Sequence, residues 1–257
     1  MNTLSPTAPV ALITGGNRGL GKSMALSLAR RGVDVIFTYR NNQAEATEVV
    51  AQIEKLGRRA VALQLDVGVA ASFGKFAAQV RDELRNRWQR DRFNYLVNNA
   101  GIGAHASFAE TTEEQFDQLV NVQFKGPFFL TQKLLPLLAD GGRIVNISSG
   151  LTRFSYPGYS AYASMKGAIE VLTRYQAKEL GARGIAVNTV APGAIETDFG
   201  GGHVRDNKEL NAAIASQTSL GRVGRPEDIG GVVASLLAPE NAWINAQRIE
   251  ASGGQML

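Results

Sequence analysis

The sequence predicts an α/β fold: a single doubly wound, Rossmann-type domain whose parallel sheet, of about seven strands, carries helices on both faces. Three observations lead to this fold class. Short apolar, β-branched runs alternate along the chain with longer segments whose apolar residues recur at helical spacing. Most strand candidates are continuous apolar runs, as expected for a parallel sheet buried on both faces. A glycine-rich turn joins the first strand to the first helix.

Strands are expected where β-branched and aromatic residues run together and stop at glycine or another turn residue. The first run, VALIT, stops at a pair of glycines, and the second, VDVIFTY, follows the glycine that closes the first helix. The expected strands cover Val10–Thr14, Val33–Tyr39, Ala60–Val67, Asn94–Gly101, Arg143–Ser149, Ile185–Gly193 and Arg248–Gly254.

Helices are expected between these strands, where apolar residues recur at helical spacing, and Gly32 and Gly57 close the first two of them. The longest expected helix contains Pro127, which is expected to weaken or bend the helix at that point. The expected helices cover Lys22–Arg31, Ala44–Leu56, Ala70–Trp88, Glu113–Leu138, Ser160–Leu180 and Pro226–Leu237. No linker or change in composition divides the chain, so residues 1–257 are expected to form one domain that begins with a flexible tail at residues 1–9.

Composition excludes several classes of site. The chain has no cysteine, which excludes disulfides, thiolate zinc sites and a cysteine nucleophile. Its two histidines, His105 and His203, are far apart in the sequence, so neither a histidine metal site nor a Ser-His triad is expected. No metal is therefore expected to bind, and neither histidine is expected to be catalytic.

Charge and hydropathy limit the kinds of binding partner that the sequence favours. With 27 basic and 23 acidic side chains the net charge is +4, which favours solubility or an anionic ligand. The densest basic run, residues 81–92, contains three acidic residues and is interpreted as a solvated helix end, so no nucleic-acid partner is expected. No run of about 18 apolar residues occurs and the first ten residues do not form a secretory signal. We therefore expect a cytoplasmic protein with no membrane partner.

The turn TGGNRGLG, residues 14–21, is a candidate phosphate-binding loop. Its glycines allow a tight turn and a close approach of the backbone to a pyrophosphate, and the following helix supplies free N–H groups and a partial positive charge. The spacing of Gly15, Gly19 and Gly21 differs from the G-x-G-x-x-G fingerprint. A plain strand-to-helix turn is the alternative, and an ATP-type P-loop is not the favoured interpretation.

The end of the second strand indicates which dinucleotide would bind. NAD sites usually carry an acidic residue there, but this strand ends in Thr38, Tyr39 and Arg40, and no acid appears before Glu45. Arg40, together with Arg18 in the glycine loop, could bind a ribose 2′-phosphate through paired N–H groups. The cofactor is therefore expected to be NADP(H); the alternative is that both arginines are merely exposed.

Six motifs occur in order: TGGNRGLG, NNAG at residues 98–101, Asn121 within VNVQFKG, ISS at 147–149, Tyr162-x3-Lys166, and PGAIET at 192–197. Together they resemble the short-chain dehydrogenase/reductase family, including its 3-oxoacyl-[acyl-carrier-protein] reductase-like and carbonyl reductase members. The similarity extends from about residue 10 to residue 254. The tyrosine–lysine pair is weak evidence alone and strong evidence in this company.

The paired residues also suit acid–base chemistry. Tyr162 and Lys166 are four residues apart and therefore share one face of a helix. A neighbouring ammonium is expected to lower the pKa of the phenol and so allow proton exchange with an alkoxide or alcohol. Ser149, at the end of the fifth strand, could hydrogen-bond the substrate oxygen. The spacing usual in the family favours Ser149 over its neighbour Ser148, which remains the alternative.

The resemblance implies further roles. Asn121 would help to hold a water-linked proton relay to Lys166, which would itself bond the nicotinamide ribose. Asp66 would contact adenine or simply cap a strand end, and Asn99 would line the adenosine side or satisfy backbone groups. The full set of expected cofactor-binding residues is Gly15, Asn17, Arg18, Gly19, Leu20, Gly21, Tyr39, Arg40, Asp66, Val67, Asn99, Ala100, Gly101, Tyr162, Lys166, Pro192, Gly193, Ile195 and Thr197.

Residues 199–218 contain three consecutive glycines followed by an amphipathic segment, which suits a lid over the substrate or, alternatively, a surface insertion. Substrate-determining segments are expected here and at residues 102–108, 151–154 and 193–195. A partly apolar ketone or aldehyde (or the corresponding alcohol) fits, and so does a 3-oxoacyl thioester. Small residues on the helix from Ser160 favour self-association, and the resemblance implies a homotetramer.

The main functional hypothesis is an NADP(H)-dependent oxidoreductase in which a hydride moves between the nicotinamide and a carbonyl carbon, with Tyr162 as general acid or base. A 3-oxoacyl thioester reductase is an alternative within the same reaction class. A cofactor-binding sensor without turnover is an alternative of another class. The complete set of Asn121, Ser149, Tyr162 and Lys166 favours the enzyme, because a sensor would not need all four.

Overall fold

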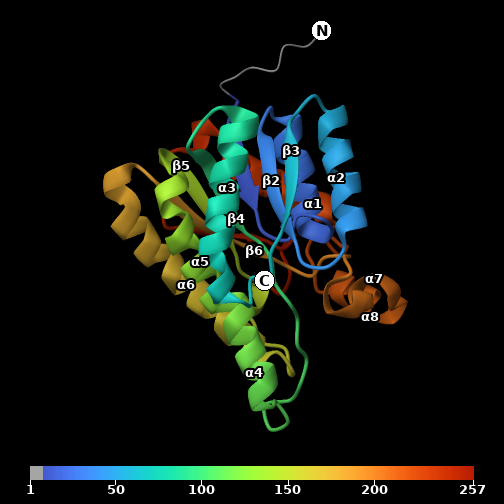
Figure 1. Ribbon diagram of the computed structural model, residues 1–257. Helices are drawn as coiled ribbons and strands as arrows, with labels where there is room; N and C mark the ends of the chain where they lie inside the picture. Colours follow the sequence, from blue (N-terminus) through green and yellow to red (C-terminus); the bar gives the residue numbers. More distant parts are fainter. Residues whose placement is uncertain (1–7) are drawn as a thin grey trace.

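The computed structural model describes residues 8–257 (Figure 1). Its strands are β1 (Val10–Ile13), β2 (Asp34–Tyr39), β3 (Ala60–Gln64), β4 (Phe93–Asn98), β5 (Leu138–Ile147), β6 (Ala186–Pro192) and β7 (Arg248–Ala251). They form one seven-stranded sheet in the order β3-β2-β1-β4-β5-β6-β7, and every neighbouring pair is parallel. The predicted fold class, a doubly wound parallel sheet, is confirmed.

The strand order reverses between β1 and β4, which are neighbours in the sheet although two other strands separate them in the sequence. In open parallel sheets this reversal leaves a crevice outside the carboxyl ends of the strands, where ligands bind. The glycine loop follows β1 directly, so the fold places it at this crevice.

The helices are α1 (Gly19–Arg30), α2 (Gln43–Lys55), α3 (Phe73–Trp88), α4 (Glu113–Leu119), α5 (Gly126–Leu134), α6 (Ser160–Leu180), α7 (His203–Asp206), α8 (Lys208–Ser216) and α9 (Pro226–Leu236). Buried residues of α1, α2 and α9 pack on one face of the sheet, and those of α3, α5 and α6 pack on the other. In Figure 1, α4 and the pair α7–α8 project beyond the carboxyl ends of the strands.

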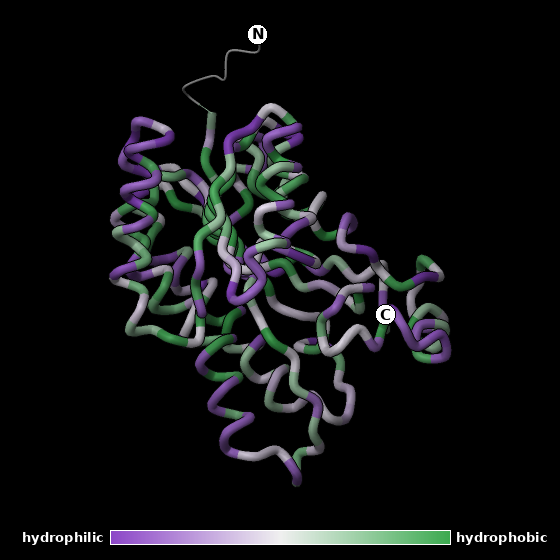
Figure 2. Tube along the Cα trace, turned by 45° about the vertical axis from the view of Figure 1, so that its right-hand side comes forward, coloured by the Kyte–Doolittle hydropathy of each residue, from purple (hydrophilic) through white to green (hydrophobic). Residues whose placement is uncertain are grey.

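Continuous burial explains why the strands are apolar throughout. Every residue of β1, β2 and β6 is buried. Because both faces are covered by helices, successive side chains on either side of these strands enter a core. In Figure 2 the central strands are largely hydrophobic, whereas the helices around them carry both hydrophilic and hydrophobic residues.

The helix predicted at Glu113–Leu138 is instead four successive segments. Between α4 and α5 lies a single π-helical stretch, Val120–Lys125, in which the Gly126 N–H bonds to the Asn121 carbonyl, and a short 3-10 turn, Leu135–Leu137, follows α5. Pro127 has no N–H to donate and sits in the first turn of α5, which accounts for the break. The last residue of the predicted helix, Leu138, belongs to β5, which begins there rather than at Arg143.

At the amino terminus, residues 1–7 of the expected flexible tail lie outside the described residues. Ala8 is buried, and its carbonyl accepts a hydrogen bond from Arg90 at 2.9 Å. The Pro9 carbonyl accepts from the Asp34 N–H at 2.8 Å. Among residues 8–257, no helix combines the length and the apolar character needed to cross a bilayer.

Candidate active site

A cavity of about 750 Å³ opens at the carboxyl ends of the strands. Of the site residues expected from the sequence, all but two line it: Tyr39 and Asn121 do not. The cavity therefore brings together residues from the carboxyl ends of six strands, β1 to β6, and from the 199–218 segment.

The glycine loop forms one end of the cavity. Gly15 and Gly19 have left-handed backbone angles, with φ of 67° and 53°. A Cβ on Gly21 would lie 2.0 Å from the Gly15 carbonyl oxygen, so only glycine fits there. Helix α1 begins at Gly19 with no side-chain cap and no acidic residue in its first turn. Such an uncapped helix start, lying against a cavity, provides the donors and partial positive charge that an anion needs.

Two side chains, Thr38 and Asn99, stabilise this loop, and only Asn99 was expected from the sequence to lie at the site. The Thr38 hydroxyl accepts a hydrogen bond from the Gly15 N–H at 3.0 Å. The Asn99 amide donates to the carbonyls of Thr14 and Gly15 at 2.9 and 3.1 Å. Of the two roles considered for Asn99, these bonds show that it satisfies backbone groups, while its side chain also borders the cavity.

Both predicted arginines lie on the cavity wall near the loop, and both are exposed. Arg18 is 3.8 Å from Asp198, a residue that the sequence analysis did not single out. Asn17 donates to Glu45 at 2.7 Å, so this acid is held by the glycine loop. The positive charge at this end of the cavity is thus partly balanced by two acids from distant segments.

Asp66 and Val67 follow β3 and also line the cavity. The Asp66 carboxylate accepts the Gly68 N–H at 2.8 Å, which is the strand-end cap that was weighed against an adenine contact. Tyr39 lies outside the cavity: its side chain is 9% exposed and belongs to the core against α1 and α2. As the last residue of a strand buried on both faces, it points into that core.

Tyr162 and Lys166 are both buried on the face of α6 that borders the cavity. The Lys166 ammonium nitrogen lies 5.6 Å from the centre of the Tyr162 ring and donates to the Ile147 carbonyl at 2.9 Å. The helical spacing therefore places the pair together as predicted, with the lysine held by the end of β5.

The expected lowering of the Tyr162 pKa is wrong for this structure. Burial raises the pKa of the phenol, and the neighbouring Ser149 hydroxyl only partly opposes this shift. Burial also lowers the pKa of Lys166 to about 7, because an ammonium loses hydration inside the protein. The lysine is therefore only partly charged near neutral pH and cannot strongly stabilise a phenolate. Tyr162 stays protonated.

The shift at Lys166 predicts a pH-dependent stability. Burial holds its pKa at about 7 in the folded protein, against 10.5 for an ordinary lysine. Between these values the unfolded chain binds more protons, so the free energy of unfolding rises with pH, by at most about 1.4 kcal/mol per pH unit. Lys166→Met is expected to stabilise the ligand-free protein near neutral pH and progressively less toward about pH 10. Urea unfolding of both proteins across this range measures the difference; a pH-independent difference contradicts the prediction.

The structure separates the two candidate serines. The Ser148 hydroxyl is buried and donates to Glu170 at 2.7 Å, so its proton is already engaged. The Ser149 oxygen accepts the Leu151 N–H at 3.2 Å, and its hydroxyl is also within hydrogen-bonding reach of the Tyr162 phenol. This arrangement favours Ser149 as the group that meets a ligand oxygen.

Asn121 lies in the π-helical stretch, half-buried and outside the cavity wall, while the next two residues, Val122 and Gln123, line it. Gln123 was missed by the sequence analysis. Its amide donates to the Ile102 carbonyl, and its buried carbonyl oxygen has no partner among the described residues. No sequence motif distinguishes such a residue from an ordinary helical glutamine.

The other end of the cavity is aromatic and aliphatic. Phe154 and Tyr156 make an edge-to-face pair with ring centres 5.8 Å apart, and Phe199 lies 5.9 Å from the Tyr162 ring. Further wall residues come from the 199–218 segment: Val204, Leu210, Ala213, Ile214 and Gln217. This segment forms helices α7 and α8 beside the cavity. Tyr156 donates to Gln217 and so connects the two walls.

Comparison with known proteins agrees with this geometry. A family model described as "Enoyl-(Acyl carrier protein) reductase" matches residues 15–255. The hydroxynaphthalene reductase-like protein Arp2 of Metarhizium brunneum is 37% identical over 258 residues, which cover 96% of this chain and 94% of that protein. The tetrahydroxynaphthalene reductase PfmaG of Pestalotiopsis fici is 36% identical and covers 95% of this chain and 90% of its own length.

Solved structures give the same result. The promiscuous reductase LugOII, described as catalysing keto-reduction at C1 during lugdunomycin biosynthesis, superposes with a TM-score of 0.92 at 40% identity, covering 98% of this chain and 99% of that one. The landomycin C-6 ketoreductase LanV, with bound NADP and rabelomycin, has a TM-score of 0.88 at 36% identity and covers 97% of both chains. With its motifs, sheet order and cavity all in agreement with these relatives, the chain belongs to the short-chain dehydrogenase/reductase family.

Proposed function

We propose that the protein is an NADP(H)-dependent ketoreductase that reduces a carbonyl group on an uncharged, fused-ring aromatic substrate. One observation carries the proposal: a single cavity joins the glycine loop and its two arginines to Tyr162 and Ser149 beneath aromatic walls. The first end suits a phosphorylated dinucleotide, and the second suits an apolar, planar ketone.

The residues at the first end fit NADP(H). The uncapped start of α1 would bind the pyrophosphate, and the exposed guanidinium groups of Arg18 and Arg40 would bind the 2′-phosphate. Lys166 and Tyr162 lie further along the same cavity, where the nicotinamide end would reach them. When bound, NADPH would supply the hydride for carbonyl reduction.

The protein's own groups would act on the carbonyl oxygen. Ser149, whose hydroxyl lies beside the Tyr162 phenol, would donate a hydrogen bond to that oxygen and so orient the carbonyl. Tyr162, kept protonated because burial raises its pKa, donates its proton as negative charge develops on the oxygen. Lys166, with a pKa of about 7, is able to gain or lose a proton near neutral pH and so return one toward Tyr162. These protonation states suit reduction rather than alcohol oxidation.

The walls of the second end support the substrate class. Phe154, Tyr156, Tyr159 and Phe199 can stack on or meet the edge of a planar ring system. The charged cavity residues other than Lys166 lie near the glycine loop or β3, so the substrate end has no group to pair with an acid or a phosphate. The relatives named for hydroxynaphthalene reduction, and LanV with bound rabelomycin, support the same class.

A substrate panel tests the proposal. NADPH oxidation is measured with butanedione, acetophenone, α-tetralone and, without oxygen, phenanthrenequinone, and then with an acetoacetyl thioester. The proposal expects kcat/KM to rise with the number of fused rings. A preference for the thioester would favour the 3-oxoacyl reductase alternative. Binding of NADPH without turnover of any member would favour the sensor.

We also propose that the protein is a homotetramer. Helices α5 and α6 expose large apolar side chains outside the cavity: Phe128 and Phe129 on α5, and Val171 and Tyr175 on α6. Small residues, including Ala163, Ser164 and Gly167, allow close approach to α6. Light scattering after size-exclusion chromatography is expected to give four times the chain mass of 27.5 kDa. A monomer would contradict the proposal.

A further inference from the structure

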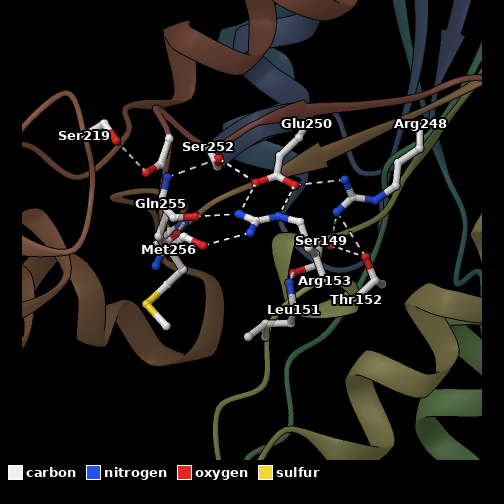
Figure 3. Close-up of polar contacts among 12 residues, drawn as sticks. Ser149, Leu151, Thr152, Arg153, Ser219, Arg248, Glu250, Ser252, Gln255 and Met256 are labelled. Atoms are coloured by element: carbon white, nitrogen blue, oxygen red, sulfur yellow. Dashed lines mark hydrogen bonds and ion pairs between the residues drawn. The ribbon is translucent and has the colours of Figure 1, made fainter.

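Next to the turn that carries Ser149 lies a network of two arginines and two glutamates, none of which lines the cavity. Figure 3 shows Arg153, Arg248 and Glu250 of this network. Arg153 follows the short turn after Ser149, and Arg248 and Glu250 lie on β7, with Glu170 on α6. Their side chains are between 14% and 35% exposed, so the ion pairs are partly shielded from water.

Arg153 is the centre of this network. Its guanidinium binds both carboxylate oxygens of Glu250, at 2.7 and 2.8 Å, and the carbonyls of Gln255 and Met256 at 2.6 and 2.8 Å. The bonds to Arg153 hold the pKa of Glu250 at about 2, so the carboxylate stays charged at any working pH. A planar, bidentate arrangement of this kind is specific to arginine.

The other arginine connects the network to the serine. Arg248 donates to Glu170 at 2.7 Å, to Glu250 at 2.9 Å and to the Thr152 hydroxyl at 3.1 Å, and it lies 3.4 Å from the Ser149 carbonyl. The network thus holds two segments by hydrogen bonds: Arg248 contacts the turn that carries Ser149, and Arg153 contacts the carboxyl-terminal residues.

The chain end that Arg153 holds in turn supports the 199–218 segment. Gln255 lines the cavity, and its side chain accepts the Ala194 N–H at 2.9 Å. The Met256 N–H donates to the Gln217 carbonyl at 2.9 Å, and Ser219 donates to the Gly254 carbonyl at 3.2 Å. One guanidinium therefore links the turn after Ser149, the carboxyl terminus and the base of α8.

We propose that Arg153 is a positioning residue that sets the distance between the two walls of the substrate cavity, and so determines whether bulky substrates bind. Its guanidinium lines no part of the cavity: it lies 5.3 Å from the centre of the Phe154 ring and holds the backbone that carries both walls. This proposal rests on the proposed ketoreductase function. Removing the guanidinium would free the carboxyl-terminal residues and the base of α8. The cavity wall that contacts a large planar ligand would then become wider and more mobile. A small ketone would still contact Tyr162 and Ser149.

The test compares two diketones that share a reactive group and differ in size, butanedione and phenanthrenequinone, assayed with NADPH without oxygen. Arg153→Ala is expected to raise KM for phenanthrenequinone about tenfold and to leave kcat/KM for butanedione within about twofold. Arg153→Lys keeps the charge but cannot make the planar set of bonds, so it is expected to resemble the alanine variant. Full rescue by lysine, or an equal loss on both diketones, would overturn the proposal.

Arg183→Ala is the matched control. Arg183 is 32% exposed, pairs with Asp140 at 2.7 Å and binds the carbonyls of Leu135 and Leu138, near the amino end of β5 and therefore away from the cavity. Arg183→Ala is expected to leave KM and kcat/KM unchanged for both diketones. A rise in KM for phenanthrenequinone alone in this variant would show that loss of any ion pair has the same effect.

A second readout does not depend on turnover. Arg153→Ala is expected to speed tryptic cleavage after Arg205 and Lys208, in the 199–218 segment, several-fold relative to wild type and Arg183→Ala, with fragments identified by mass spectrometry. Unchanged cleavage would overturn the proposal. If the wild type reduces neither diketone, the proposed function fails, and the cleavage rates still decide whether Arg153 holds this segment.

Discussion

Replacing Tyr162 by phenylalanine is expected to lower kcat for ketone reduction by about 10²–10⁴-fold, the usual contribution of a general acid. The variant loses only the hydroxyl, and the ring retains its packing 5.9 Å from Phe199. Because burial raises the pKa of the phenol and keeps it protonated, the substitution removes the proton that Tyr162 would donate. Steady-state rates of NADPH oxidation with the best substrate of the panel measure the loss.

Tyr159→Phe is the matched control, because Tyr159 also lines the cavity but lies on the turn before α6, away from Lys166. It is expected to keep kcat within about threefold of wild type. NADPH titration should give similar dissociation constants for all three proteins. Full activity of Tyr162→Phe, or an equal loss in Tyr159→Phe, would show that another group delivers the proton.

Arg40→Asp is expected to lower kcat/KM for NADPH about 100-fold and to leave kcat/KM for NADH within about threefold of wild type. The substitution removes a charge-assisted hydrogen bond and places a carboxylate against the 2′-phosphate, and each effect disfavours only the phosphorylated cofactor. Parallel assays with the two cofactors at one substrate concentration measure the selectivity.

The control for this change is Arg81→Asp, which makes the same charge reversal at a half-exposed site on α3. It should not alter the ratio of the two cofactors. If Arg40→Asp keeps the wild-type ratio of kcat/KM for NADPH to that for NADH, then other residues bind the 2′-phosphate or the protein does not recognise it.

Local patterns explain why much of the site could be predicted. Tyr162 and Lys166 meet because residues four apart on a helix share a face, a relation that the sequence displays directly. The glycine loop is equally local: its left-handed residues and the closely packed Gly21 follow one another within seven positions of the chain. The sheet itself could be predicted because buried parallel strands are apolar along their whole length.

Features that depend on distant segments could not be predicted. The pKa of Tyr162 is set by how completely the surrounding elements exclude water, which no four-residue spacing reveals. The Asp198 carboxylate reaches Arg18 only because the loop after β6 returns to the glycine loop. Arg153 and Glu250 are 97 positions apart and meet because β6 pairs with β7 beside β5.

Burial reverses the expected effect of Lys166 on the pKa of Tyr162. A lysine was expected to stabilise a phenolate, but burying both groups together weakens the lysine's charge and favours the neutral phenol. The same residues thus remain in place while the favoured chemistry moves from accepting a proton to donating one. Opposite charges help each other in a buried pair only when the gain exceeds the cost of removing them from water.

The most direct test of the proposed reaction follows an isotope from cofactor to product. The experiment uses NADPH in which deuterium replaces both hydrogens on the nicotinamide carbon that gives the hydride. This cofactor is incubated with the wild type and α-tetralone, and the product is analysed by mass spectrometry and NMR. The proposal predicts the corresponding alcohol with one deuterium on the former carbonyl carbon, and almost none formed by Tyr162→Phe. An alcohol without deuterium at that carbon, or no alcohol from any fused-ring ketone, would contradict it.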